Sequence, residues 1–285
     1  MTRLVALALL SVAACAELDP PTLIKRDRVL GAKVTVDGDP ERAWPSPGEQ
    51  ATVTWLTASP GAQATFSWTL FACPAATSVG MPACAGDPIA SSQSAGAVPP
   101  LQLAVPADIT ASSIVVAGAI CASGTPAFDA ATASAACSDG SRVDVVSQHV
   151  FLAIDGDNRN PDLRRAPITF TEESWNGGDD CEISVEPGGK RAVIGVAFED
   201  ADRERFVTAQ GVDTREELQL AAFATAGEIL QQHTYVDPAD ERALAQIAFE
   251  WDPPVDGAGS PIDFFLVVRD MRGGVDMTTR RLCVR

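Results

Sequence analysis

The chain has 285 residues, 38 acidic and 21 basic side chains, and a formal net charge of −17. Phosphate backbones and anionic lipid headgroups repel such a polyanion, which argues against nucleic acid as a partner and against electrostatic adhesion to membranes. The length is sufficient for two domains of ordinary size.

The chain opens with the features of an export signal. One basic residue, Arg3, precedes an apolar run over 4–14 that is too short to cross a bilayer as a helix. A basic start, a short apolar core and small residues before a break are typical of a secretory signal peptide. We therefore predict a signal peptide over residues 1–14.

The end of this run, Val12-Ala13-Ala14-Cys15, resembles the lipobox of bacterial lipoproteins, in which an aliphatic and two small residues precede an acceptor cysteine. The resemblance implies cleavage between Ala14 and Cys15, a diacylglyceryl group on the Cys15 thiol and acylation of the new amino terminus. Several acyl chains on one residue are enough for stable anchoring. Ala16, where an aspartate would favour inner-membrane retention, implies sorting to the outer membrane. The alternative is an ordinary cleaved signal that happens to contain a cysteine.

The cysteine count is consistent with this assignment. Seven cysteines in an exported protein leave one thiol unpaired, and assigning Cys15 to the lipid leaves six. Three disulfides in an oxidising compartment account for these six, and the lack of a Cys-x-x-Cys pair disfavours metal binding. Pairing of sequence neighbours is one of the 15 arrangements that six cysteines allow. It joins Cys73 to Cys84, Cys121 to Cys137, and Cys181 to Cys283.

Residues 15–27 are expected to form an extended tether, because Pro20 and Pro21 disfavour helix. From residue 28 onward, short apolar segments rich in β-branched and aromatic residues alternate with turn residues, which is typical of a β-sandwich. The strands expected in the first domain, 28–154, cover 29–36, 51–56, 64–71, 113–121 and 143–154. Residues 74–100, rich in Ala, Ser, Gly and Pro, are interpreted as a long surface connection.

A polar, acidic linker over 155–166 lacks hydrophobic periodicity and separates a second domain, 167–285. The strands expected there cover 181–185, 191–198, 217–225, 244–251, 263–269 and 277–284. Segments 227–236 and 239–245 could each contain a helical turn. The predicted fold is therefore all-β, with two tandem β-sandwich domains. In strand count, turn spacing and tryptophan positions they resemble immunoglobulin-like or fibronectin type III-like modules, such as those of many Gram-negative lipoproteins.

No catalytic motif accompanies this pattern. The two histidines, His149 and His233, lack a nucleophile elbow or a zinc-binding helix motif around them. Paired carboxylates at Glu172-Glu173 and Asp179-Asp180 could serve a glycosidase, but adjacent pairs arise by chance among 38 acidic residues. We expect that the protein is not an enzyme.

The linker offers a candidate calcium site, since hard cations bind several carboxylate, amide and carbonyl oxygens. It resembles the calcium-binding linkers between cadherin repeats, although it keeps neither their residue order nor that of an EF-hand loop. An ordinary interdomain turn is the alternative interpretation. A calorimetric titration without heat at millimolar calcium would reject the hypothesis. The candidate ligands are Asp155, Asp157, Asn158, Asn160 and Asp162.

Together these features predict a non-catalytic lipoprotein of the cell envelope that presents two disulfide-stabilised sandwiches for binding or structural roles. Its expected partners are the membrane, through the lipid, and an envelope protein or a glycan. Two alternatives remain open. One is an envelope hydrolase or carbohydrate-active protein that uses acidic residues of the second domain, and the other is a structural spacer in an outer-membrane assembly.

Metabolic labelling with a fatty-acid analogue tests the anchor. We expect the wild-type chain to incorporate the label and Cys15→Ala to lose it, because the variant lacks the acceptor thiol. Ser11→Ala, in the same segment but outside the lipobox, serves as the control and should stay labelled. An unlabelled wild-type chain contradicts the assignment.

Overall fold

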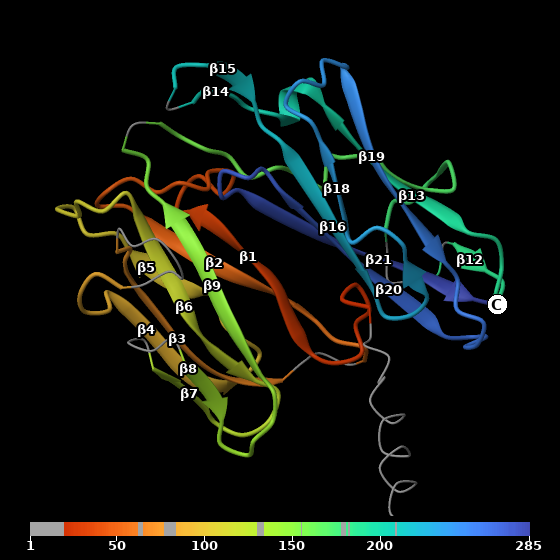
Figure 1. The fold of residues 1–285 in the computed structure, drawn as a ribbon, viewed down its shortest axis with the longest axis horizontal. Helices are drawn as coiled ribbons and strands as arrows, with labels where there is room; N and C mark the ends of the chain where they lie inside the picture. Colours follow the sequence, from red (N-terminus) through yellow and green to blue (C-terminus); the bar gives the residue numbers. More distant parts are fainter. Residues whose placement is uncertain are drawn as a thin grey trace, which may run out of the picture.

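The computed structural model describes residues 20–61, 65–76, 84–129, 134–154, 156–177, 181, 183–208 and 210–285. The signal peptide, Cys15 and Asp155 lie outside the described residues. The described chain is all-β apart from one short 3-10 helix, η1 (Asp200–Asp202), and its sheets build two sandwiches that lie side by side (Figure 1). The predicted fold class is confirmed.

The first sandwich has a three-stranded sheet facing a four-stranded one. Alternating residues of both sheets point inward and form one apolar core, which includes Val34, Val53 and Trp68. The first sheet has the order β1 (Arg28–Val36), β2 (Gln50–Ala58), β5 (Leu101–Ala104). The second has the order β4 (Ala90–Gly96), β3 (Phe66–Pro74), β6 (Ser113–Cys121), β9 (Val143–Phe151).

The interpretation of residues 74–100 as a surface connection is wrong in part. Residues Ala90–Gly96 form β4, which pairs antiparallel with β3 from Ala72↔Ala90 to Phe66↔Gly96. Its sequence, Ala-Ser-Ser-Gln-Ser-Ala-Gly, has no apolar alternation because β4 is an edge strand with no buried residue. An edge strand held by backbone hydrogen bonds does not need the pattern by which strands are predicted.

The second sandwich has two five-stranded sheets. At its centre, the Phe264 ring lies 5.1 Å from that of Trp251 and 5.3 Å from that of Trp175, both edge-on. One sheet has the order β11 (Glu173–Ser174), β10 (Ile168–Phe170), β13 (Ala192–Glu199), β19 (Leu244–Asp252), β17 (Glu228–Ile229). The other has the order β12 (Ser184–Val185), β21 (Val275–Val284), β20 (Pro261–Arg269), β16 (Leu218–Ala224), β18 (His233–Val236).

The expected helical turns in this half are wrong. Segment 227–236 contains β17 and β18, and segment 239–245 is a turn that leads into β19. β18 pairs with β16 but buries only Val236, so a period of two is hard to recognise in its sequence. Tertiary pairing overrides weak local preference in such short segments.

Two hairpins extend from the sheets. In the first sandwich, β7 (Pro126–Asp129) pairs with β8 (Ser134–Cys137). This hairpin places Phe128 5.2 Å from Phe71 on the outer face of β3. In the second sandwich, β14 (Arg205–Val207) pairs with β15 (Asp213–Arg215).

The six cysteines of the two sandwiches form three disulfides, which confirms the predicted disulfide bonding. The bond between Cys121 and Cys137 ties hairpin β7–β8 to β6, and each of the other two also closes a loop within one sandwich. The arrangement is the one that pairs sequence neighbours: Cys73–Cys84, Cys121–Cys137 and Cys181–Cys283.

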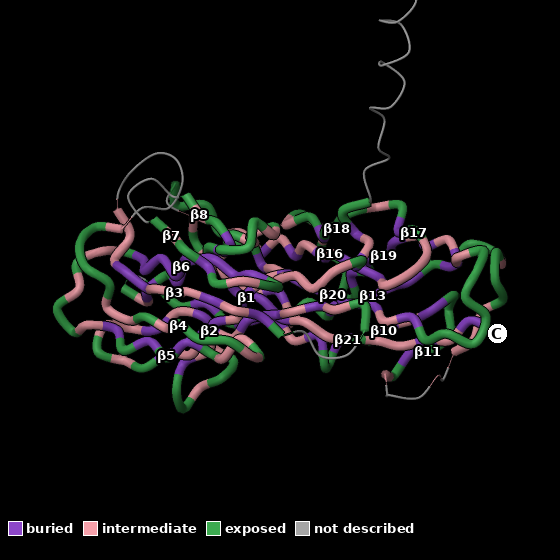
Figure 2. The backbone as a smooth tube through the Cα atoms, turned by 90° about the horizontal axis from the view of Figure 1, so that it is seen from below, coloured by how far each residue is buried: buried purple, intermediate pink, exposed green. Residues whose placement is uncertain are grey.

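An apolar cluster joins the two sandwiches where β1 meets β20 and β21. Figure 2 shows the backbone of these strands at the junction. We call it the docking cluster. Its members are all buried and come from both sides of the junction, so the hydrophobic interior continues from one sandwich to the other. Each large member contributes about 1.5–3 kcal/mol through burial. The cluster comprises Ile24, Leu30, Leu56, Ala58, Phe223, Phe265, Val267 and Val275.

Substitutions of two adjacent phenylalanines in β20 distinguish the contribution of the docking cluster from that of the core of the second sandwich. Phe265 belongs to the docking cluster, whereas Phe264 points into the core of the second sandwich. We expect Phe265→Ala to cost about 3 kcal/mol and to split a single calorimetric unfolding transition into two, because it removes contact between the sandwiches.

Phe264→Ala is the matched control. It should lower the stability of the second sandwich without increasing the radius of gyration of the folded protein in X-ray scattering. A single transition and an unchanged radius of gyration for Phe265→Ala would show that the docking cluster does not couple the sandwiches.

Candidate functional site

The two asparagines of the linker join the sandwiches. The Asn160 side chain donates to the Val34 carbonyl (2.7 Å) and accepts from the Val275 amide (2.9 Å). The Asn158 side chain donates to Asp270 (2.7 Å). Both asparagines are buried, so their amides satisfy backbone and carboxylate groups that docking removes from water.

The linker carboxylates have different partners. The Asp157 carboxylate accepts from the Asn158 amide (2.8 Å), and that of Asp162 accepts from the Arg164 amide (2.9 Å). Within the part of the chain that the structure describes, no three His, Cys, Asp or Glu side chains are grouped to hold a metal ion. Asp155 lies outside this part, and calcium binding by the linker stays a prediction.

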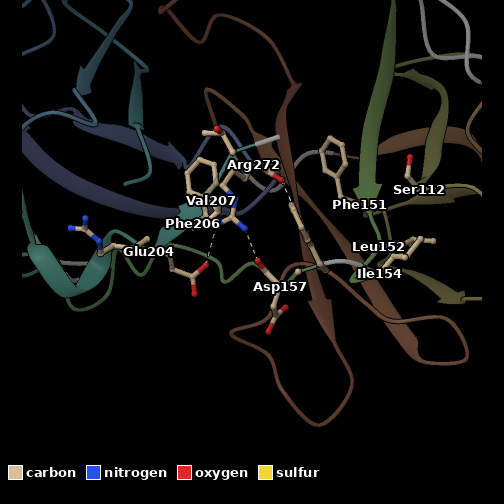
Figure 3. Close-up of a pocket in the computed structure, with 13 residues that line it drawn as sticks. Ser112, Phe151, Leu152, Ile154, Asp157, Glu204, Phe206, Val207 and Arg272 are labelled. Atoms are coloured by element: carbon tan, nitrogen blue, oxygen red, sulfur yellow. Dashed lines mark hydrogen bonds and ion pairs between the residues drawn. The ribbon is translucent and has the colours of Figure 1, made fainter. Parts of the chain in front are cut away.

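A groove of about 830 Å³ opens at the junction of the two sandwiches, and we call it the junction groove. Phe151 at the end of β9, with Leu152 and Ile154 just after it, forms one side, whereas Phe206 and Val207 of β14 form the other (Figure 3). Its size and its position between two folded units are typical of ligand-binding sites. The remaining lining residues are Trp44, Ser112, Gly156, Asp157, Glu204, Arg205, Thr208 and Arg272.

Arg272 connects the two sides of the junction groove. Its guanidinium carbon lies 5.0 Å from the centre of the Trp44 ring and 4.4 Å from that of Phe206, within the range of cation–π interactions. Trp44 donates its indole N–H to the Arg272 carbonyl (3.0 Å). Because Trp44 belongs to the first sandwich and Phe206 to the second, Arg272 fixes their separation.

The turn from Asp270 to Gly274 holds Arg272 in place. The Asp270 carboxylate accepts hydrogen bonds from the amides of Arg272 (2.7 Å) and Gly274 (2.9 Å). Gly273 has a φ of 110°, and a Cβ at this position would lie 2.8 Å from the Phe151 ring. Only glycine therefore lets the turn pass this closely beneath the groove.

Two buried carboxylates lie behind Arg272. Glu216 is 2% exposed and accepts from the Arg272 guanidinium (2.6 Å) and the Glu204 amide (3.1 Å). Burial and the neighbouring charge of Asp270 raise the pKa of Glu216 to about 8. Burial also raises the pKa of Asp270 above its ordinary value. Arg272 alone cannot neutralise two ionised carboxylates in this enclosed position. Burial and the neighbouring carboxyl of Asp270 therefore favour the protonated form of Glu216 near neutral pH.

The histidines and the glutamate pair singled out for chemistry, all of them described, lie in different parts of the fold. His149 lies in β9 of the first sandwich and His233 in β18 of the second. Glu172 and Glu173 are exposed at the turn between β10 and β11, and Asp179 and Asp180 lie outside the described residues.

Sequence reasoning missed the groove residues Trp44, Phe206 and Arg272. Their only local signal was the turn Arg272-Gly273-Gly274, which indicates a chain reversal and no particular chemistry.

The site and fold define a class: an all-β, disulfide-bonded protein of two docked sandwiches with a groove at their junction. No helix in the described ranges is both long and apolar enough to span a membrane. No protein-family model and no curated protein matches the sequence.

Two solved structures show weak similarity to the chain. The first is a β-glucuronidase of Parabacteroides merdae, with a TM-score of 0.21 and 10% identity, covering 88% of this chain and 25% of that one. The second is the native conformation of E. coli α-2-macroglobulin, with a TM-score of 0.22 and 10% identity, covering 92% of this chain and 16% of that one. The chain spans a small part of these large bacterial proteins, and neither likeness carries information on function.

The raised pKa of Glu216 predicts how stability depends on pH. A carboxyl whose pKa is higher in the folded state than in the unfolded state contributes its full stability below the unfolded value, here about 4.5. That contribution is lost as pH rises through the folded value of about 8. As pH rises from 5 to 9, we expect the loss of this contribution to lower the free energy of unfolding of the wild type by on the order of a few kcal/mol.

Urea unfolding of Glu216→Gln at several pH values checks this expectation. Because Gln does not titrate, the free energy of unfolding of the variant should fall less steeply with pH than that of the wild type. A difference between the two proteins that is the same at every pH does not affect this comparison. Glu217→Gln, at the next and half-buried position, is the control and should keep the wild-type slope. Equal slopes for wild type and Glu216→Gln would mean that Glu216 does not hold the proton.

Proposed function

We propose that this protein is a non-catalytic binding protein of the cell envelope, held at the outer membrane by lipid on Cys15, and that the junction groove is its ligand site. The observation that carries the proposal is the groove itself. It is a concave surface lined by large apolar side chains from both sandwiches, and its opposite sides are held at a fixed separation by Arg272. A preformed apolar concavity with a few placed polar groups suits binding.

The chemistry of the groove supports binding over hydrolysis. The described residues that line it include no histidine, cysteine or lysine. Glu216, whose raised pKa would suit a general acid, is enclosed, and both of its oxygens already accept hydrogen bonds. A substrate atom in the groove could not take its proton without opening the junction.

The position of the groove supports presentation away from the tether. The chain enters the structure beside the end of β16, where Ile24 donates to the Ala224 carbonyl (2.8 Å). Hairpin β14–β15 precedes the beginning of the same strand, at Leu218, and lies at the opposite end of the junction (Figure 1). Seven strand residues span about 23 Å. A tether running from Ile24 back to Cys15 would leave the groove facing away from the membrane.

Site-specific photo-crosslinking in intact envelopes tests this proposal. With a photoreactive amino acid at Val207, which is 67% exposed at the groove, we expect a discrete adduct that recurs between preparations. The same amino acid at Val255, which is 77% exposed between β19 and β20 and outside the groove, is the control and should not give it. Absence of any adduct at position 207, or the same adducts at both positions, would reject the groove as the ligand site.

A further inference from the structure

We infer that the ligand of the junction groove is a polypeptide segment that combines an apolar side chain with a nearby lysine or arginine. This inference rests on the proposed function, since it names the chemistry of what the groove binds. It follows from three properties of the described lining: its arginines are already in ion pairs, the carboxylate of Asp157 at its rim forms no ion pair, and three of its large apolar side chains are exposed.

The two arginines of the groove are engaged within the protein. Arg272 contacts Glu216 (2.6 Å) and Glu204 (3.5 Å), and its guanidinium is covered by two aromatic rings. Arg205 pairs with Asp213 (3.1 Å) beside the groove. An anionic ligand would compete with these carboxylates, and it would approach a chain whose net charge is −17.

The negative charge of the groove is available. Asp157 is exposed at the rim, and its carboxylate accepts the backbone amide of Asn158 (2.8 Å). Its backbone carbonyl accepts from the Arg272 guanidinium (2.5 Å), but among the described residues the carboxylate itself forms no ion pair. Glu204 lies beside it in the lining and is shared between Arg272 and Arg159. A cationic side chain placed at Asp157 gains a charge-assisted hydrogen bond at the rim, and it approaches a chain whose net charge is −17.

The apolar part of the lining is equally specific. Three large side chains stay exposed where the groove opens: Phe151 (38%), Ile154 (49%) and Val207 (67%). Large exposed apolar side chains around one opening are typical of interaction sites. They complement an aliphatic or aromatic side chain of a partner.

The same lining disfavours a glycan. Sugars need open aromatic faces together with several hydrogen-bonding groups. The Trp44 and Phe206 rings each have the Arg272 guanidinium against one face. Among the described residues of the lining, the uncharged polar side chains are Ser112 and Thr208. An apolar side chain can pack on the exposed apolar side chains of the groove, and a neighbouring cation can pair with the carboxylate of Asp157. Polypeptides supply that combination.

Binding of the full chain to synthetic peptides of equal length tests the inference. The peptides differ in two respects only, the presence of one large apolar residue and the presence of adjacent lysines or arginines, and a glycan array is probed in parallel. We expect the apolar-basic peptides to bind most tightly, with an affinity that falls as salt is raised.

Two variants separate the two parts of the recognition. Val207→Asn removes apolar contact without adding charge and should weaken every bound peptide about fivefold. Asp157→Asn keeps the acceptor for the Asn158 amide but removes the charge, so it should weaken only the basic peptides by about the same factor and reduce their salt dependence. Val255→Asn and Asp256→Asn, both exposed and adjacent to each other away from the groove, are the matched controls and should leave affinity unchanged.

The outcomes distinguish the ligand class from the function. If glycans or uncharged peptides bind best and Val207→Asn weakens them, the ligand class is overturned and the groove remains the binding site. If Asp157→Asn leaves basic peptides unaffected, the role of the rim carboxylate is wrong. If nothing binds, or if Val207→Asn and Val255→Asn behave alike, the proposed function fails together with the inference.

Discussion

The guanidinium of Arg272 lies between one ring from each sandwich, and the geometry of the whole junction depends on it. Its contacts with Trp44 and Phe206 set the width of the groove, while its hydrogen bond to Glu216 holds it against the buried carboxyl groups of Glu216 and Asp270. The arginine is mostly enclosed, so its charge must be compensated locally. Asp270 fixes the turn from which it projects, and Asn158 in turn binds Asp270. Residues that form the groove and residues that dock the sandwiches are therefore one connected network.

Beneath this network, docking combines an apolar cluster with buried amides. The docking cluster supplies nonspecific burial, which by itself allows several relative positions of the two sandwiches. Asn160 is compatible with only one of these relative positions, because it binds the Val34 carbonyl on one side and the Val275 amide on the other. Lys33 and Asp276, 2.7 Å apart, add an ion pair across the same boundary. Polar groups that are costly to leave unpaired thus specify the arrangement that the apolar groups stabilise.

The sequence predicts the fold much better than the site, and the reason is the range over which each is determined. Thr52-Val53-Thr54-Trp55 alternates between the two faces of β2, so this strand is visible locally. Edge strand β4 is not predicted from its sequence, because backbone pairing and not side-chain burial holds it in the sheet. The groove depends on contacts such as that between Trp44 and Arg272, which are 228 positions apart in the chain. Composition singles out Asn158 and Asn160 as candidate calcium ligands, but it does not reveal that their side-chain nitrogens donate hydrogen bonds at the junction of the sandwiches.

The way in which the chain enters the structure has a mechanical consequence. Thr22 and Ile24 exchange backbone hydrogen bonds with Ala224 of the second sandwich before the chain continues into β1 of the first. A force applied ahead of Thr22 therefore reaches both sandwiches at their shared boundary, and the first sandwich does not carry it alone. The load meets the end of β16 along a short backbone pairing that is backed by the buried Ile24 side chain. Pulling on the chain ahead of Thr22 would strain that pairing first and leave the groove, at the other end of the strand, undistorted.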